Sequence, residues 1–399
     1  MNEQIKQRIT QLNNDEVPSG YEKTEFGVFP CDWVTNKKLK DLGTFGKGKG
    51  LPGDKMTSEG VPCVGYGDIY MKYNHFHFEE AQTFVDEETA SDSQPIQKGT
   101  LLFTGTGETA EEIGKCVCYN GDETIYAGGD IITFVSDKVN PLFLAYQQYQ
   151  EFSLRKKASY GQGHSVVHIQ RDNLEKLNVA YPKSTEEQSK IAEILMKWDE
   201  AIELQEQYIA LVETRKKVLM RKLLTPQEDW KYVLLGDICE IKTGRLDANA
   251  MEEDGAYPFF TCSKEVYKIN QYSFECEALL MAGNGDIGDV KYYNGKFDAY
   301  QRTYVLSKFS FDIHYVMQYL LQNFDRDVMK GMQKSSMPYI KLDLLKNARI
   351  HYKSADIQNT VKILSIVDAE ITLCNKKLEQ LKKQRKTLQQ YLLNGIVRV

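Results

Sequence analysis

Two long stretches of the chain, residues 186–224 and 356–394, contain neither proline nor glycine. Within each stretch, apolar residues recur at alternating steps of three and four positions. This 3.5-residue period is typical of a coiled coil rather than of an ordinary surface helix. We therefore expect two long helices that pack along an apolar seam. The seam of the first comprises Leu195, Trp198, Ile202, Ile209, Val212, Leu219 and Leu223, and that of the second comprises Leu364, Val367, Ile371, Leu378, Leu381, Leu388 and Leu392.

The two seams repeat one another. Each seam residue from Leu195 onward has a counterpart 169 positions later, and the polar interruptions coincide as well, Gln205 with Cys374 and Lys216 with Arg385. Two helices that each capped a separate domain would have no reason to share these polar positions. The pattern thus predicts a duplicated architecture, in which each half is a globular domain followed by one long helix.

Chain geometry sets the direction of the helices. Only a short segment containing Pro226, a helix stop signal, leads from the first helix into the second domain. The second helix starts at the far side of that domain, so it has to run back toward the first. We therefore expect antiparallel helices, related by a pseudo-two-fold axis near Ile209 and Leu378.

This register also predicts which polar seam residues meet. Lys216 is expected within about one turn of Cys374, and Arg385 within about one turn of Gln205. The helix from Leu195 to Leu223 would span about 42 Å, compared with ~34–36 Å for one turn of DNA. We expect the two helices to act as a ruler between two similar heads.

The segments outside the helices indicate an α+β fold. Short apolar runs at 99–104, 278–281 and 302–306 are bounded by glycine, asparagine and aspartate, which is typical of strands. Helices are expected at 142–152 and 313–324. The predicted fold class is two pseudo-repeated α+β domains separated by two long antiparallel coiled-coil helices. The expected boundaries are 1–183 and 226–353 for the domains, and 184–225 and 354–399 for the helices.

The composition narrows the class of protein. Of the 399 residues, 42% are hydrophobic and 11% aromatic, which suits globular cores and excludes a disordered chain. No apolar run is long enough to span a bilayer and the first residues are polar, so we expect a cytoplasmic protein with no membrane partner. The net charge of −6 argues against a purely electrostatic DNA binder. Any DNA contact would use local patches, completed by partner subunits.

A series of short motifs gives the chain a family resemblance. In the first half they lie at 30–33, 46–50, 66–70 and 159–169, with a further motif at 186–195 in the first helix. In the second half they lie at 242–250, 283–286, 300–305 and 336–341. In this order and duplication the chain resembles the specificity (S) subunit of type I restriction-modification systems, over essentially its whole length.

The resemblance implies a DNA-recognition role without catalysis. Each head would be a target recognition domain that reads one part of a bipartite target in double-stranded DNA. The helices would set the spacer and dock two methyltransferase (M) subunits, which carry S-adenosylmethionine and methylate adenine N6. Motor-endonuclease (R) subunits, using ATP and Mg, would join for restriction of foreign DNA. The chain itself would hold no cofactor. Because recognition domains vary most in such families, the base-contacting residues do not carry over.

Candidate DNA contacts are indicated by the type of side chain and by the loop in which it lies. Cations in glycine-rich turns can approach a phosphate closely, although an ordinary solvated turn has the same composition. Amide, arginine and tyrosine side chains in repeated loops can reach base edges, although Arg302 can equally be an ion-pair partner and Tyr73 a core residue. The phosphate candidates are Lys47, Lys49, Lys55, Lys242 and Arg245, and the base candidates are Tyr66, Tyr73, Gln162, His164, Ser165, Tyr300, Gln301, Arg302, Gln333, Lys334 and Ser335.

Catalytic, cofactor and metal sites are not expected. Residues 103–107 resemble a glycine-rich cofactor loop, and residues 140–143 resemble the Asn-Pro-Pro-Phe motif of adenine methyltransferases, but the second proline is absent. Pro141 suits the start of a helix. His75 and His77 lack further obvious metal ligands. Two alternatives remain: a coiled-coil interaction adaptor without DNA recognition, and a self-contained modification enzyme, for which the chain has no room.

Overall fold

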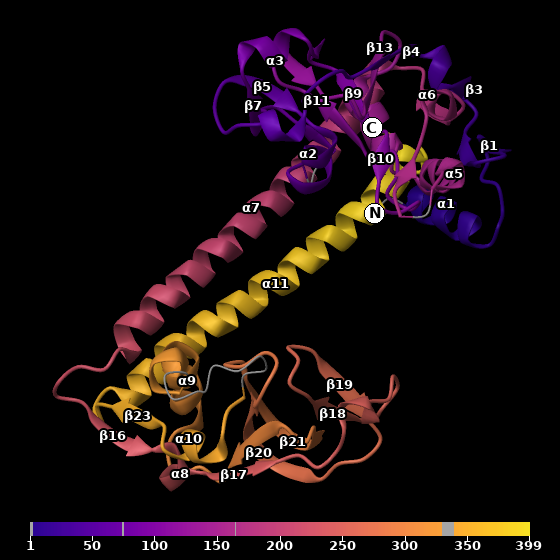
Figure 1. Ribbon diagram of the computed structural model, residues 1–399. Helices are drawn as coiled ribbons and strands as arrows, with labels where there is room; N and C mark the ends of the chain where they lie inside the picture. Colours follow the sequence, from indigo (N-terminus) through magenta and orange to yellow (C-terminus); the bar gives the residue numbers. More distant parts are fainter. Residues whose placement is uncertain (1–2, 74–75, 164, 329–338) are drawn as a thin grey trace. The chain divides into compact units, whose positions relative to one another are not determined.

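The structure is a computed structural model that describes residues 3–73, 76–163, 165–328 and 339–399. Contacts within the chain divide it into two compact units. Unit 1 comprises Met1–Leu204 and Leu378–Val399, and unit 2 comprises Gln205–Lys377. The long helices α7 (Thr185–Leu224) and α11 (Ile357–Leu393) each contribute one half to either unit (Figure 1). The contacts therefore group the chain differently from the four segments expected from the sequence.

Unit 1 contains a five-stranded sheet in the order β4-β13-β9-β11-β6 and a four-stranded sheet in the order β7-β5-β12-β8. Three two-stranded ladders, β1-β2, β3-β15 and β10-β14, complete its β structure. The strands are β1 (Tyr21–Thr24), β2 (Gly27–Pro30), β3 (Trp33–Lys38), β4 (Gly43–Lys47), β5 (Val61–Val64), β6 (His77–Phe78), β7 (Thr83–Val85), β8 (Gln94–Ile96), β9 (Thr100–Thr104), β10 (Thr106–Gly107), β11 (Cys116–Tyr119), β12 (Ile125–Ala127), β13 (Ile131–Ser136), β14 (Val167–His168) and β15 (Asn178–Pro182). The shorter helices are α1 (Glu3–Asn13), α2 (Tyr66–Met71), α3 (Glu87–Ser91), α4 (Pro141–Gln147), α5 (Glu151–Tyr160) and α6 (Arg171–Leu174).

The core of unit 1 runs from the sheet into the long helices. Phe134 of β13, Phe143 of α4, Leu195 of α7 and Leu392 of α11 belong to one cluster of fully buried side chains. Full burial of each such side chain stabilises the fold by about 1.5–3 kcal/mol. The helix ends are thus part of the core of this unit.

Unit 2 contains one six-stranded sheet in the order β17-β22-β20-β21-β18-β19 and a ladder of β16 with β23. Its core joins Leu279 of β20 and Val316 of α9 to Leu224 of α7 and Leu364 of α11. The strands are β16 (Lys231–Leu234), β17 (Glu240–Thr243), β18 (Tyr257–Phe260), β19 (Val266–Ile269), β20 (Phe274–Ala282), β21 (Val290–Ala299), β22 (Thr303–Ser307) and β23 (Arg349–Tyr352). The shorter helices are α8 (Leu235–Ile238), α9 (Ile313–Asp327) and α10 (Leu342–Lys346).

The two units have the same topology. The order β4-β13-β9-β11 in unit 1 matches β17-β22-β20-β21 in unit 2. In unit 1, β5 pairs in parallel with β12, and in unit 2, β18 pairs in parallel with the end of β21. The single long strand β21 therefore corresponds to β11 and β12 together. The expected fold class, with two pseudo-repeated α+β domains and two long antiparallel helices, is confirmed.

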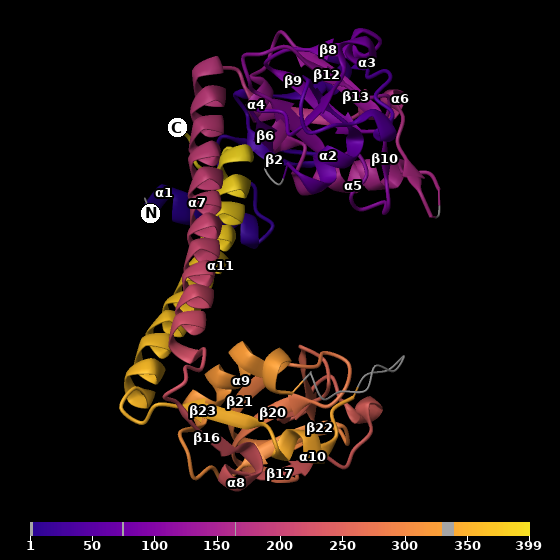
Figure 2. The same ribbon diagram turned by 60° about the vertical axis from the view of Figure 1, so that its left-hand side comes forward.

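The helices α7 and α11 run side by side in opposite directions (Figure 2). They begin and end within one residue of the expected stretches. Every predicted seam side chain is buried or half-buried. Between the two helices, Gln205 Nε2 donates a hydrogen bond to the carbonyl oxygen of Cys374 at 3.3 Å. In the described part of the chain, no helix has the length and apolarity needed to cross a membrane.

The partners expected for Lys216 and Arg385 were wrong. Arg385 forms an ion pair with Asp199 in unit 1 at 2.8 Å, and Lys216 forms one with Asp368 in unit 2 at 2.6 Å. Asp199 and Asp368 are themselves 169 positions apart, so the two ion pairs are equivalent by the repeat. The prediction failed because the aspartates lie beside the apolar seam, where the periodicity does not single them out.

Each ion pair also holds a helix of its own head. In unit 1, Tyr146 of α4 donates to Asp199 at 2.8 Å. In unit 2, Gln318 of α9 donates to Asp368 at the same distance. The equivalent head helices are thus fixed to equivalent points of the long helices.

The segment expected to form one helix over 142–152 forms two. α4 ends at Gln147 and α5 begins at Glu151, because Gln150 takes an extended conformation with ψ 145°. At the start of α4, Asn140 Oδ1 accepts a hydrogen bond from the Phe143 amide at 3.1 Å, and Pro141 is the first helical residue. The Asn-Pro pair therefore caps a helix, as expected.

The last residues of the chain pack on the first strands of unit 1. Arg398 forms two hydrogen bonds to the Asp32 carboxylate, at 3.0 and 2.9 Å, and two more to Glu187, at 2.6 and 2.9 Å. Tyr21 donates to the carbonyl oxygen of Gly395 at 2.5 Å. Unit 1 is thus closed by residues from both ends of this sequence.

Candidate nucleic-acid interface

Three loops and the segment after β14 meet at one end of the five-stranded sheet of unit 1. The loops follow β4, follow β9 and precede β13. The amide of Gly105 donates to Asp130 at 2.8 Å, the amide of Ile169 donates to Gly105 at 3.0 Å, and the amide of Gly48 donates to Ile131 at 2.8 Å. A Cβ atom at Gly48 would collide with the carbonyl oxygen of Gly128, so this close crossing requires glycine. We call this arrangement the corner of unit 1.

The six-stranded sheet of unit 2 ends in the same arrangement. The amide of Gly283 donates to Arg302 at 2.9 Å, the amide of Ile340 donates to Gly283 at 2.9 Å, and the amide of Gly244 donates to Thr303 at 3.2 Å. A Cβ atom at Gly244 would collide with the carbonyl oxygen of Ala299. We call this the corner of unit 2.

The shared bonds align the two corners residue by residue. Gly48 corresponds to Gly244 and Gly105 to Gly283. Ile169 and Ile340 are equivalent as the sequence predicted, although neither is part of a strand. The same bonds make Asp130 the counterpart of Arg302.

Each corner opens into a cavity, and the two cavities have similar volumes. The cavity of unit 1 is about 580 Å³ and that of unit 2 about 510 Å³. Side chains at equivalent places line both, and they differ in charge and in hydrogen-bonding groups. Polar or charged residues of the first cavity include Lys47, Thr106, Asp130, His168, Arg171 and Asp172, and those of the second include Thr243, Asn284, Gln301, Arg302, Tyr304 and Tyr339.

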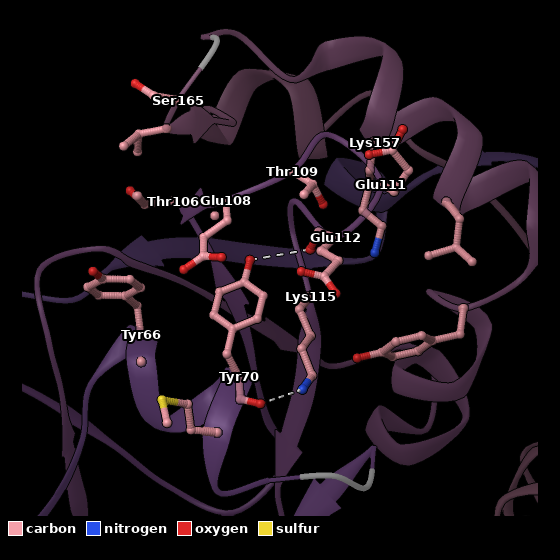
Figure 3. A pocket seen from close by; sticks show the side chains of 16 residues that line it. Tyr66, Tyr70, Thr106, Glu108, Thr109, Glu111, Glu112, Lys115, Lys157 and Ser165 are labelled. Atoms are coloured by element: carbon pink, nitrogen blue, oxygen red, sulfur yellow. Dashed lines mark hydrogen bonds between the residues drawn. The ribbon is translucent and has the colours of Figure 1, made fainter. Parts of the chain in front are cut away.

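A larger cavity of about 1020 Å³ adjoins the corner of unit 1, and Thr106 lines both (Figure 3). Tyr66 and Ser165, chosen independently from the sequence, both lie in its wall. Tyr70 crosses it, donating to the carbonyl oxygen of Glu112 at 3.3 Å, and its own carbonyl accepts from Lys115 at 3.4 Å. The structure therefore brings two of the candidate residues to one cavity.

Lys157 forms part of the wall of this larger cavity (Figure 3). Only 1% of its surface is exposed. Its Nζ donates to the carbonyl oxygen of Gly114 at 2.8 Å and lies 5.4 Å from the centre of the Tyr149 ring. Burial lowers the pKa of this lysine to about 8. Burial therefore disfavours the charged form of this lysine. The sequence did not indicate that Lys157 is buried.

The lysines predicted in unit 1 all lie at the surface. Lys47 is the last residue of β4, Lys49 follows the crossing at Gly48, and Lys55 ends a short 3₁₀ helix. None of the three forms an ion pair with another described residue. Of these, only Lys47 lines the corner cavity.

The two cations predicted in unit 2 differ. Lys242 lies within strand β17 and not in a turn, and it forms an ion pair with Glu240 at 2.6 Å. Hydrogen bonds from Lys242 and Lys308 lower the pKa of Glu240 to about 2. Arg245 is exposed in the loop after Gly244 and has no ion-pair partner among the described residues. We therefore retain Arg245 as a phosphate candidate and withdraw Lys242.

The tyrosine candidates also separate. Tyr66 is 42% exposed, whereas Tyr73 is 3% exposed and stacks on Phe78 with ring centres 4.0 Å apart. Tyr73 is thus a core residue, which is the alternative that the sequence left open for it. Tyr300 is half-buried, and its amide donates to Phe260 at 2.9 Å.

The remaining base candidates fall in three groups. Gln301 and Arg302 are exposed and line the corner cavity of unit 2. Gln162 is exposed beside the corner of unit 1, where its backbone bonds with His168. Outside the described residues lie His164, Gln333, Lys334 and Ser335.

Sequence reasoning missed Asp130 and Asn284 in the two cavities. Both follow or precede glycine in loops that carry no basic or aromatic signal. Aligning the strands that follow, 131–136 with 303–307, would have placed Asp130 opposite Arg302. The repeat therefore indicated this position. Asp130 was not predicted because it lacks the positive charge that is typical of a phosphate contact.

A sequence model of the type I restriction modification DNA specificity domain matches residues 30–214 and 227–383. The chain belongs to the type I restriction-modification DNA specificity family. Its role is therefore DNA sequence recognition within such a system. Each of the two matched stretches contains one corner. The chain is thus related to the recognition subunits of such systems.

Relatives differ in how much they share with this family member. It is 36% identical to the type I restriction enzyme EcoDI specificity subunit of Escherichia coli over 172 residues, which cover 42% of this chain and 38% of that subunit. It is 24% identical to the putative type I restriction enzyme MjaX specificity subunit of Methanocaldococcus jannaschii over 428 residues, 95% of this chain and 97% of the relative. The strong similarity is therefore confined to part of the E. coli subunit.

Solved structures share the fold of this specificity-family chain. The crystal structure of the type I restriction-modification S subunit from M. genitalium has a TM-score of 0.59 at 17% identity, over 90% of this chain and 96% of that one. A chain from a study of complex assembly and conformational transition of the type I R-M system has a TM-score of 0.55 at 13% identity, over 96% and 100%.

Proposed function

We propose that this chain reads a bipartite DNA target, with the corner of unit 1 reading one half-site and the corner of unit 2 the other. The observation that carries this proposal is the duplicated corner. The same backbone crossing is built twice, at Gly48 and Gly244, and each time it frames a cavity lined in part by polar side chains. The frame is constant and the lining differs, which suits two different half-sites.

The surface around the corners favours a nucleic acid over a small ligand. Lys47, Lys49 and Arg245 stand exposed beside the crossings without ion-pair partners among the described residues. Unpaired cations beside glycine can approach phosphates, which fix the position of a protein on DNA, while side chains in the cavities reach base edges. The overall charge of −6 means that partner subunits supply part of the electrostatic attraction.

The long helices present an apolar surface suited to a methyltransferase (M) subunit. In unit 2, Glu370 of α11 accepts a hydrogen bond from Tyr208 at 2.8 Å and pairs with Arg215, both of α7. On α7, Leu211 lies three residues after Tyr208, and Val218 lies three residues after Arg215. On α11, Ile366 lies four residues before Glu370, and Leu373 lies three residues after it. Helical spacing therefore places all four apolar side chains on the same flank. They are 58–66% exposed.

Such a cluster of exposed apolar side chains marks an interface. The repeat-related positions in unit 1, Lys197, Leu204, Gln380 and Thr387, are more polar. We infer that two M subunits dock on the helices, with the stronger apolar contact on unit 2. S-adenosylmethionine would reside in those subunits, and ATP and Mg in the R subunit. The complex would work in the cytoplasm and methylate adenine N6.

Methylome sequencing tests the recognition role. A host that expresses this chain with its M subunit is compared with a host that expresses the M subunit alone. We expect a new adenine-methylation motif, made of two half-sites and an unspecific spacer. A stable complex that produces no motif would instead favour a coiled-coil adaptor without DNA recognition.

Co-purification tests the docking flank. Leu211→Lys together with Leu373→Lys should abolish capture of the M subunit, because two charges would be buried without partners. Lys217→Glu changes an exposed residue on another side of α7 and serves as the matched control. Retained capture by the double variant, with circular dichroism showing intact helices, would place the docking site elsewhere.

A further inference from the structure

The two corners carry opposite charges at one equivalent position, where Asp130 stands in unit 1 and Arg302 in unit 2. Each residue accepts a backbone hydrogen bond from the glycine that follows the equivalent strand, Gly105 at 2.8 Å and Gly283 at 2.9 Å. Each is followed directly by a strand, β13 or β22. Their side chains therefore leave the same point of the same frame.

Neither charge is neutralised within its own unit. Both side chains are exposed at the rim of a corner cavity. Neither forms an ion pair or a side-chain hydrogen bond with another described residue. Two cations line the same cavity as Asp130: Arg171 is paired with Glu175 at 2.6 Å, and Lys47 forms no ion pair with a described residue. Both groups thus remain available to a ligand.

Base edges offer these two groups different partners. A carboxylate on a DNA-facing rim is repelled by phosphates and can be satisfied only by a donor, which the major groove supplies as the amino group of cytosine or adenine. A guanidinium finds two acceptors on guanine, O6 and N7. The charge reversal therefore demands opposite hydrogen-bonding groups from the DNA at equivalent places.

We propose that Asp130 and Arg302 are specificity-determining residues, with Asp130 selecting an amino-bearing base in one half-site and Arg302 selecting guanine in the other. This inference rests on the proposed function. The neighbours agree with it: Gln301 and Asn284 offer amides beside Arg302, while Thr106 and His168, 3.1 Å apart, stand beside Asp130.

The test is the methylation motif of single variants, expressed with the M subunit. Arg302→Ala should relax one G·C position of one half-site, and Arg302→Gln should shift that position toward adenine. Asp130→Ala should relax one position of the other half-site. The loss of a good base contact corresponds to a fall in discrimination of about 5- to 150-fold at that position. All other positions should keep their preference.

Two control variants separate base reading from general binding. Arg245→Ala removes a candidate phosphate contact, so it should weaken binding on every sequence and lower the salt dependence without changing the motif. Lys242→Ala removes a cation that is already paired with Glu240, so it should change neither motif nor affinity. Circular dichroism and co-purification with the M subunit establish that each variant is folded.

The outcomes distinguish this inference from the function on which it rests. A wild-type chain that gives no motif contradicts the proposed function itself. A wild-type motif that is retained unchanged in Asp130→Ala and Arg302→Ala overturns the inference and leaves the function standing. A change in both half-sites from one substitution would also overturn it, because each corner would then not read independently.

Discussion

At the scale of single residues, the buried ammonium of Lys157 makes the stability of unit 1 depend on pH. The folded-state pKa is about 8, below the ~10.4 of an unfolded lysine, because burial disfavours the charged form. Between these two values the unfolded chain binds more protons, so stability rises with pH. Burial raises the pKa values of the neighbouring Cys116 and Tyr149, which therefore stay neutral through most of this range.

We predict that wild-type protein gains on the order of 2–3 kcal/mol relative to Lys157→Met between pH 7.5 and pH 10.5. Urea unfolding of both proteins across this range measures the difference, which cancels titrations common to the two. A constant difference would show that Lys157 is solvated in the folded protein.

The sequence indicated single residues by type but not by surroundings. Exposed cations beside glycine, such as Lys49 and Arg245, were predictable because few other roles need a charge there. The sequence did not assign Tyr73 to the core, because its stacking on Phe78 depends on a partner that the local sequence does not identify. Lys242 was misplaced because its carboxylate neighbour, Glu240, points to the same side of a strand.

At the scale of elements, the two repeat-related ion pairs differ in burial. The side chains of Arg385 and Asp199 are 9% and 5% exposed, whereas those of Lys216 and Asp368 are 22% and 36% exposed. A buried charge that loses its partner is expensive, and a partly solvated one is not. Loss of the cation should therefore lower the free energy of unfolding more in unit 1 than in unit 2.

We predict that Arg385→Met lowers the free energy of unfolding by about 3–5 kcal/mol, because Asp199 is left buried and unpaired. Lys216→Met should cost only about 0.2–1 kcal/mol. Urea denaturation gives both values. Adding Asp199→Leu to Arg385→Met should recover most of the loss, and a double variant as unstable as the single one would argue against an uncompensated charge as the cause.

The long helices were the most predictable elements, since the 3.5-residue repeat extends over many turns and both ends carry clear signals. The break between α4 and α5 was not predictable, because residues 148–150 carry no proline or glycine and the extended Gln150 is fixed by packing. The corner cavities were only partly predictable from the sequence. Their glycines stood out, but the pairing of loops from three strands is a tertiary property.

At the scale of the whole molecule, the repeat predicts that spacer and half-sites are separable. Seven residues inserted after Gln207 and seven after Lys376 keep the seam in phase and add about 10 Å to each helix. We predict that the unspecific spacer of the methylation motif grows by about three base pairs, at ~3.4 Å each, and that both half-sites stay the same.

The control for this prediction is an insertion in α7 alone. It would misalign the seam and the repeat-related ion pairs, so no motif should form. If the paired insertion left the spacer unchanged, the helices would not set it.

Unit 1 is assembled from two segments, with Leu378–Val399 packed against strands near the start of the chain. On the ribosome, synthesis of this unit therefore begins before that of unit 2 and is completed after it. The 173 residues of unit 2 (Gln205–Lys377) must be made in between, which takes about 9–35 s at ~5–20 residues per second. During that interval Leu195 and its neighbours lack the helix that covers them. The apolar core of unit 1 therefore stays partly exposed until residues 378–399 have been synthesised. A frameshift near residue 378 would consequently spare the continuous unit 2 and damage unit 1, whose larger segment, Met1–Leu204, lies upstream of unit 2.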